Sequence, residues 1–171
     1  ALLHKGRIVL IADTLVHEWP DEEDLATIAE RGAAVARSLG LEPRVAFMSF
    51  STFGYPVSAR AEKMPPAPRV LDARGVDFEY DGEMTVDVAM NMEQMANYPF
   101  CRLTGPANVL VVPARHSASI STKLMQEMAG ATVIGPILTG IDESIQICST
   151  TSTASDILNM AVLAAAKIGH P

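Results

Sequence analysis

Short apolar runs alternate with amphipathic stretches along most of this chain. Runs rich in Val, Ile and Leu predict strands at residues 7–15, 45–50, 76–80, 108–112, 132–137 and 144–148. Segments with helical spacing of their apolar residues predict helices at residues 21–39, 58–74, 84–96, 117–128 and 155–168. Because predicted strands and helices alternate, we expect an α/β fold with three layers and a mainly parallel sheet.

Local signals sharpen some of these predictions. Asp21 is a favourable N-cap residue, and Asp24 lies at the matching position of a capping box. Gly40 is typical of a helix end. The run 45–50 is apolar on both faces and therefore predicts a central strand, whereas Asp81-Gly82 predicts a turn. A group of prolines interrupts the predicted helix 58–74 and must break or kink it.

Length and charge exclude several classes of protein. The 171 residues fit one domain, and a hydrophobic fraction of 49% allows a sizeable core. A net charge of −7, with no cluster of Lys and Arg, argues against a nucleic-acid partner, although a local site for a small anion remains open. No apolar run reaches the roughly 20 residues that a membrane span needs, and no signal peptide is recognisable. We therefore expect a cytoplasmic protein without a membrane partner.

The cysteines and histidines suggest no metal site. Cys101 and Cys148 lack the spacing of a metal site or a disulfide framework, which predicts buried, free thiols. The four histidines are scattered without ligand spacing.

Two polar segments are candidates for binding an anion. The segment Ser49 to Gly54 directly follows a predicted strand, and ligands collect at the carboxyl ends of strands in open α/β sheets. Its hydroxyl and backbone N–H groups suit a phosphate or carboxylate, but a serine-rich turn that caps the next helix explains them equally well. Arg115 and Lys123 bracket a polar loop after another strand, which is either an anion site or a plain surface connection.

Six motifs occur in the order found in phosphate acetyltransferases, and the chain resembles the C-terminal half of that family. The motifs are Ser49-Phe50-Ser51, Asp81-Gly82-Glu83 with Asp87, Gly105 to Leu110, Thr122-Lys123, Gly135 to Gly140, and Ser155-Asp156-Ile157. The resemblance implies the second α/β lobe of a two-lobed, isocitrate/isopropylmalate dehydrogenase-like fold. It assigns residues 1–152 to that lobe and residues 153–171 to a C-terminal helix that would return to a missing first lobe.

Two further segments resemble one branch of this family more closely. Ile11 to Pro20 and Pro43 to Gly54 are similar to the acetyltransferase-like C-terminal domain of large bacterial NADP-dependent malic enzymes. This resemblance implies a preceding part that decarboxylates malate oxidatively with NADP and a divalent metal, and a C-terminal part that responds to acetyl-CoA. It also implies self-association as a homodimer or larger assembly. The chain begins at Ala1 rather than Met, so we expect a piece of a longer protein.

The main departure from the transferases lies in the loop 147–151. The family has Asp-Leu-Ser-Arg-Gly there, and this chain has Ile-Cys-Ser-Thr-Thr. Thr150 replaces the catalytic arginine and cannot supply its guanidinium, while Ser149 and Asp156 are retained. Losing one such group costs about 10²–10³ in rate. The resemblance therefore implies an acetyl-CoA site without catalytic residues and without a cofactor or metal of its own. The expected ligand contacts are Ser149, Thr150, Asp156, Ser51 and Lys123.

Two other functions remain open at this point. One is a working phosphate acetyltransferase with an altered loop, which would make acetyl-CoA from acetyl phosphate and CoA. The other is a structural dimerisation module with an empty cleft. Acetyl transfer by the full-length protein would identify the first, and the absence of stabilisation by CoA compounds would favour the second.

Overall fold

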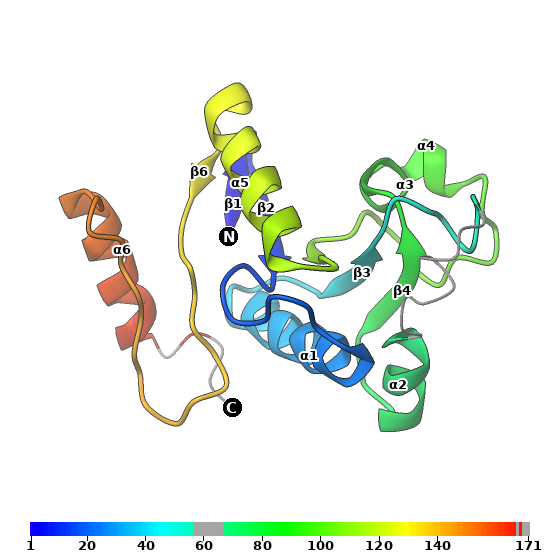
Figure 1. The fold of residues 1–171 in the computed structure, drawn as a ribbon, viewed down its shortest axis with the longest axis horizontal. Coiled ribbons are helices and arrows are strands. Elements are labelled where there is room, and N and C mark those ends of the chain that lie inside the picture. Colours follow the sequence, from blue (N-terminus) through cyan, green and yellow to red (C-terminus); the bar gives the residue numbers. More distant parts are fainter. Residues whose placement is uncertain (57–66, 167, 169–171) are drawn as a thin grey trace.

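The structure is a computed structural model that describes residues 1–56, 67–166 and 168. Within these residues the strands are β1 (Leu2–His4), β2 (Arg7–Ala12), β3 (Arg44–Met48), β4 (Glu79–Met84), β5 (Val109–Val111) and β6 (Thr132–Val133). The helices are α1 (Glu22–Ser38), α2 (Ala67–Arg74), α3 (Val86–Met90), α4 (Met92–Met95), α5 (Arg115–Ala129) and α6 (Ala154–Ala165). Figure 1 shows their arrangement.

The six strands form one mixed sheet in the order β4-β3-β5-β2-β1-β6. The pairs β4-β3, β3-β5 and β5-β2 are parallel, whereas β1 is antiparallel to both β2 and β6. The prediction of a mainly parallel sheet with β3 at a central position is therefore confirmed. Because parallel strands end at the same edge, the loops that follow β2, β3 and β5 lie on one side of the molecule.

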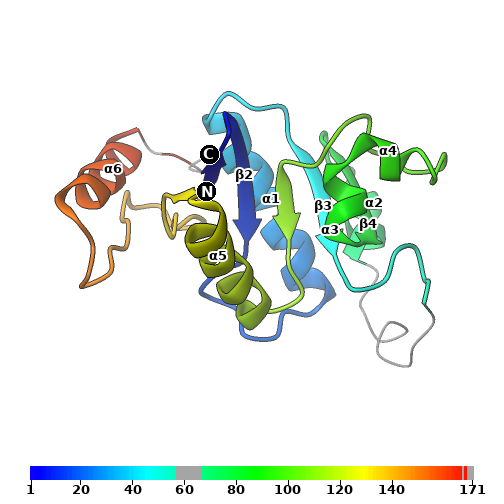
Figure 2. The ribbon, with the colours of Figure 1, turned by 90° about the horizontal axis from the view of Figure 1, so that it is seen from above.

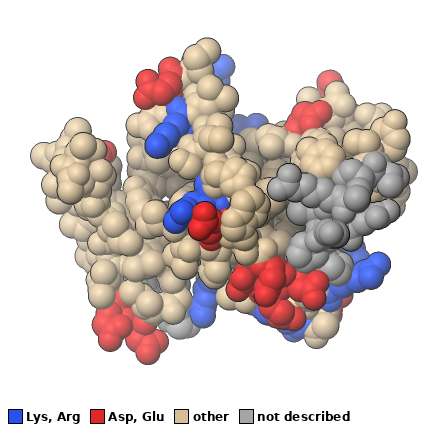
Figure 3. Space-filling view, viewed as in Figure 1, with Lys and Arg blue, Asp and Glu red and all other residues tan. Residues whose placement is uncertain are grey.

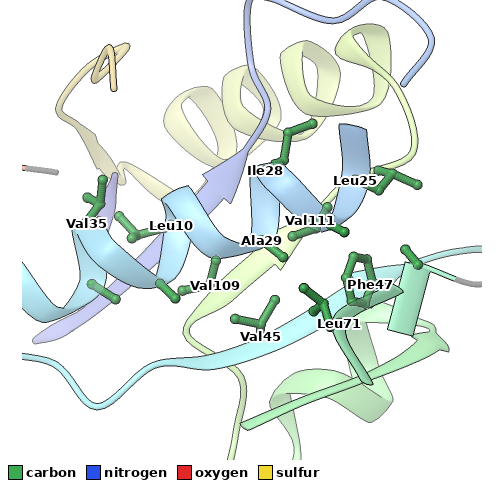
Figure 4. Packing of buried hydrophobic residues seen from close by; sticks show 14 of the residues in the cluster. Leu10, Leu25, Ile28, Ala29, Val35, Val45, Phe47, Leu71, Val109 and Val111 are labelled. Carbon is green, nitrogen blue, oxygen red and sulfur yellow. The ribbon is translucent and has the colours of Figure 1, made fainter. Parts of the chain in front are cut away.

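Helices cover both faces of the sheet, so the predicted three layers are present (Figure 2). One core cluster joins α1 and α2 to one face of β2, β3 and β5, and a second joins α3, α4 and α5 to the opposite face. Figure 4 shows the first cluster, in which Ala29 of α1 lies near Val109 and Val111 of β5. Gly32 permits this close packing, because a Cβ atom there would lie 2.7 Å from a methyl group of Val109.

The predicted ends of α1 are confirmed in detail. The carboxylate of Asp21 accepts a hydrogen bond from the backbone N–H of Asp24 at 2.9 Å, and the carboxylate of Asp24 accepts one from Asp21 N–H at 3.1 Å. This reciprocal pair is a capping box. Gly40 follows the helix with φ +75°, a conformation that glycine adopts without a steric penalty.

The structure corrects the prediction of a turn at Asp81-Gly82, because both residues lie inside β4 and pair with β3. The buried Asp81 carboxylate accepts hydrogen bonds from the N–H groups of Gly82 and Arg102, so a residue typical of turns is satisfied within a strand. A Cβ atom on Gly82 would lie 2.9 Å from the carbonyl oxygen of Phe47. Pairing with β3 thus needs this glycine, and β4 begins only at Glu79, later than predicted.

Three other predictions need correction. The helix expected at 84–96 is divided into α3 and α4 at Asn91, whose backbone is extended and whose side chain accepts a hydrogen bond from Glu93 N–H. Residues 144–148 form no strand; instead the Gln146 side chain bonds the backbone of Leu138. The helix expected at 58–74 is observed only as α2, and its first part lies outside the described residues.

The cysteines are free within the described part of the chain, as predicted, but they are not buried. Cys148 is exposed and Cys101 is half-buried.

Helix α6 stands apart from the sheet at the end of an extended segment that follows β6 (Figures 1 and 2). Ile157, Leu158 and Val162 are exposed on this helix, whereas Met160 is buried. The helix therefore presents three apolar side chains on its surface. The division of the chain at residue 152 stays a prediction.

Candidate functional site

A cleft of about 830 Å³ lies between the body of the sheet and α6. Its walls come from the end of β2 and the loop after it, from α1 and α5, from the extended segment after β6, and from the start of α6. Figure 3 shows the opening between α6 and α5. A space of this size and mixed lining is typical of a small-molecule site.

Three of the five predicted ligand contacts line this cleft. Lys123 comes from α5, Ser149 from the loop before α6, and Asp156 from the first turn of α6. Thr150 is exposed and does not line the cleft, although its neighbours Ser149 and Thr151 do. The fold therefore brings Lys123 of α5 to the same cleft as Ser149 and Asp156, which lie near each other in the sequence. Their contact with a ligand stays a prediction.

Ser51 lies elsewhere, in a buried hydrogen-bonded group at the ends of β3 and β4. Its hydroxyl donates to the Glu83 carboxylate at 2.7 Å and lies 3.0 Å from the Ser49 hydroxyl. The same Glu83 oxygen accepts the N–H of Gly54 at 3.1 Å. These bonds fix the loop after β3, and the start of the helix that a serine-rich turn here was predicted to cap lies outside the described residues. A ligand contact at Ser51 stays a prediction.

Asp156 has a structural role at the edge of the cleft. Its carboxylate accepts hydrogen bonds from the backbone N–H and the hydroxyl of Thr153, each at 2.8 Å, and its own N–H donates to that hydroxyl. This second capping box begins α6. The bonds from Thr153 hold the pKa of Asp156 below its ordinary value. Asp156 is therefore ionised at neutral pH and is unsuited to act as a general base.

Asp13 organises the loop after β2 in a similar way. Its carboxylate accepts the N–H groups of Leu15 at 2.7 Å and His17 at 2.8 Å, and it lies 2.9 Å from Nδ1 of the His17 ring. Burial alone would raise the pKa of Asp13, but the hydrogen bonds from Leu15, Val16 and His17 outweigh it and lower the pKa. Within the described residues no group of three His, Cys, Asp or Glu side chains could hold a metal ion.

Asp13→Asn should lower the free energy of unfolding by about 1 kcal/mol at pH 7, because half-exposed N–H groups of the loop lose their charged acceptor. Since folding lowers the pKa of Asp13, its contribution is complete above the ordinary value of 3.8 and is lost as the pH falls through the lower, folded value. Urea unfolding should thus show a difference in the free energy of unfolding between variant and wild type that is smaller at pH 3 than at pH 7.

The control for this measurement is Asp142→Asn, at an exposed position in the extended segment. A stability difference for Asp13→Asn that is the same at both pH values would contradict the assigned role.

Arg31 is a cleft residue that the sequence did not single out. It projects from α1, and its Nε atom lies 3.4 Å from the point that a Cβ atom on Gly140 would occupy. In the sequence Arg31 is one of several charged residues on the polar side of an amphipathic helix, so nothing distinguishes it locally. On the opposite wall, the Thr122 hydroxyl is buried and has no hydrogen-bond partner within the described residues.

The chain belongs to the phosphate acetyl/butaryl transferase family, whose description matches residues 1–165. It is 56% identical over 167 residues to the NADP-dependent malic enzyme of Rhizobium meliloti (strain 1021), covering 98% of this chain and 22% of that protein. It is 34% identical to the phosphate acetyltransferase of Bacillus subtilis (strain 168), covering 92% of this chain and 49% of that protein.

Solved structures agree with the family assignment. The chain superimposes on a phosphotransacetylase from Streptococcus pyogenes with a TM-score of 0.90 and 29% identity, covering 98% of this chain and 52% of that one. The predicted phosphate acetyltransferase fold is thus confirmed. The chain spans about a fifth of the length of the malic enzymes that it matches and about half of the Bacillus subtilis transferase. Within the described residues no helix is long and apolar enough to cross a membrane.

Proposed function

We propose that this chain is a regulatory, acetyl-CoA-binding and self-associating part of an NADP-dependent malic enzyme, which converts malate to pyruvate and CO₂. The likeness to malic enzymes of Rhizobium meliloti and Rickettsia prowazekii, at 56% and 40% identity over nearly the whole chain, supports this parent protein. NADP and the divalent metal would bind in another part of it. We expect the assembled protein to be cytoplasmic.

The observation that carries this proposal is a cleft that has Ser149, Lys123 and Asp156 but no arginine in the adjoining loop. Thr150 stands at the position where the transferases place their guanidinium. Acetyl transfer needs positive charge aimed at the developing negative charge, whereas binding of the same ligand does not depend on that one group. This combination supports an effector site derived from a transferase.

Regulation would require the effector to bind more tightly in one state of the assembled enzyme than in another. Exposed apolar side chains support self-association. Ile120, Leu124 and Met128 lie four residues apart along α5 and are 65%, 59% and 80% exposed. A row of this kind is typical of a surface that another protein covers.

The test is calorimetric titration of acetyl-CoA into the full-length protein. Micromolar binding that weakens in Ser149→Ala, without acetyl transfer on addition of phosphate, is the expected result. Asp156→Ala should also weaken binding, but this change removes the capping box of α6. Asp156→Glu is the matched control, because glutamate at this position preserves a capping box. Absence of binding to the wild type would make the ligand site wrong and leave an assembly module.

A working phosphate acetyltransferase is the second candidate function. The family match and the 34% identity to the Bacillus subtilis enzyme favour it. Rapid acetyl-CoA formation by the full-length protein would establish this function and exclude the first proposal.

A further inference from the structure

Two basic side chains reach the cleft from helices on opposite faces of the sheet. Arg31 belongs to α1, which packs on one face, and Lys123 belongs to α5, on the other. Both line the same cleft, which also contacts the last three residues of β2 and the loop after that strand. A ligand in the cleft is thus flanked by positive charge from two sides.

Neither of these charges is neutralised by the protein in the described part of the chain. Four other arginines have a carboxylate oxygen within 4.0 Å, and these are Arg37, Arg74, Arg102 and Arg115. Arg31 and Lys123 have none there.

The two carboxylates that line the cleft do not take this role. Asp13 is engaged by the N–H groups of its own loop and by His17, and Asp156 is engaged by Thr153. Since both carboxylates are committed to the backbone that carries them, the two cations are available to an external anion.

The rest of the lining indicates what such an anion carries. Hydroxyl groups accompany Lys123 on α5, at Ser119 and Thr122, and the buried Thr122 hydroxyl lacks a partner in the described residues. Apolar side chains make up much of the remaining lining. They are Ile28 and Val35, which lie on α1 three and four residues from Arg31, and Ile134, Ile137, Leu138 and Ile147 from the segments after β6. A lining of this mixed kind suits a molecule that carries both charged groups and a long uncharged part.

We propose that Arg31 and Lys123 together bind the phosphate groups of the acyl-CoA nucleotide, while apolar side chains of the lining contact the pantetheine arm. Arginine suits this role because its planar guanidinium binds phosphate through two parallel hydrogen bonds, and lysine adds a point charge. The inference rests on the proposed function, and it assigns to Arg31 a phosphate-binding role that is separate from the acyl end at Ser149.

The experiment compares two ligands, of which only acetyl-CoA carries the phosphorylated nucleotide. Acetyl-CoA and acetyl-pantetheine are titrated into the full-length protein and into Arg31→Gln and Lys123→Gln variants. Arg31→Gln should weaken acetyl-CoA binding about tenfold or more, the effect of losing a charged hydrogen-bonding partner, and should leave acetyl-pantetheine binding unchanged. Arg37→Gln is the matched control, because Arg37 lies on the same helix but pairs with Asp77.

Two outcomes would overturn the inference while the wild type still binds acetyl-CoA. One is unchanged acetyl-CoA affinity in Arg31→Gln. The other is an equal loss for both ligands, which would assign Arg31 a purely structural role. If the wild type does not bind acetyl-CoA at all, the proposed function fails. Titration of sodium diphosphate into the wild type and into Arg31→Gln then tests the anion site separately. Diphosphate binding that Arg31→Gln abolishes would support the site, and absence of diphosphate binding would reject it.

Discussion

The full-length protein should form acetyl-CoA from acetyl phosphate and CoA at least about a hundredfold more slowly than the Bacillus subtilis phosphate acetyltransferase. The reason is the loss of the loop guanidinium at Thr150, since removing one preorganised group of this kind costs about 10²–10³ in rate. The measurement is the initial rate of thioester absorbance at saturating substrates. A turnover close to that of the Bacillus enzyme would falsify the assignment as a non-catalytic site.

A variant of the loop shows whether this sequence change is the cause. Replacing Ile147→Asp, Cys148→Leu, Thr150→Arg and Thr151→Gly together recreates the loop of the transferases around the retained Ser149. This variant should transfer acetyl groups faster than the wild type, whereas Thr150→Ala, the control, should not. Equal rates in all three proteins would mean that the loop is not what limits the chemistry.

Gly82→Ala should lower the free energy of unfolding by about 2–5 kcal/mol. This is the sum of two costs, that of placing alanine in a backbone conformation with positive φ and that of overpacking against β3. Gly82 has φ +142°, and a Cβ atom there would lie 2.9 Å from both the Cβ atom and the carbonyl oxygen of Phe47. Because backbone atoms of β3 cannot move aside, the added methyl group must weaken or break the hydrogen bonds between β3 and β4. Hydrogen exchange of the β3 and β4 amides in the full-length protein is the suitable measurement.

Gly75→Ala separates the two contributions. Gly75 also has a positive φ, of +65°, but no atom lies within 4 Å of the position of its added Cβ. This control should lose only about 1–2 kcal/mol, from backbone conformation alone. Similar protection of the β3 and β4 amides from hydrogen exchange in both variants would show that the contact with Phe47 adds no cost at Gly82.

Sequence reasoning succeeded where the determining interaction is local. The capping box of α1 lies within four residues, and the helix itself depends on the local spacing of apolar residues, so Asp21, Asp24 and the range 21–39 were assigned correctly. The central strand β3 was also predictable, because burial on both faces leaves an apolar run in the sequence. The same reasoning placed Lys123, Ser149 and Asp156 together, but only through the family resemblance.

The failures concern residues whose role is decided by distant partners. Asp81 and Gly82 have the composition of a turn, yet pairing with β3 and the N–H of Arg102 hold them in a strand. Arg31 is distinguished from other helix arginines only by the cleft beside it. The hydroxyl of Ser51, proposed for a ligand, already donates to Glu83, which lies 32 residues further along the chain.

The glycine at position 32 gives α1 a second consequence beyond core packing. With no side chain at Gly32, the helix rests directly against Val109, and Arg31 is the adjacent residue on that helix. The position of the Arg31 backbone relative to the sheet therefore depends on this contact in the interior. A methyl group added at Gly32 would displace α1 and carry the base of the Arg31 side chain with it, without a change to any surface residue.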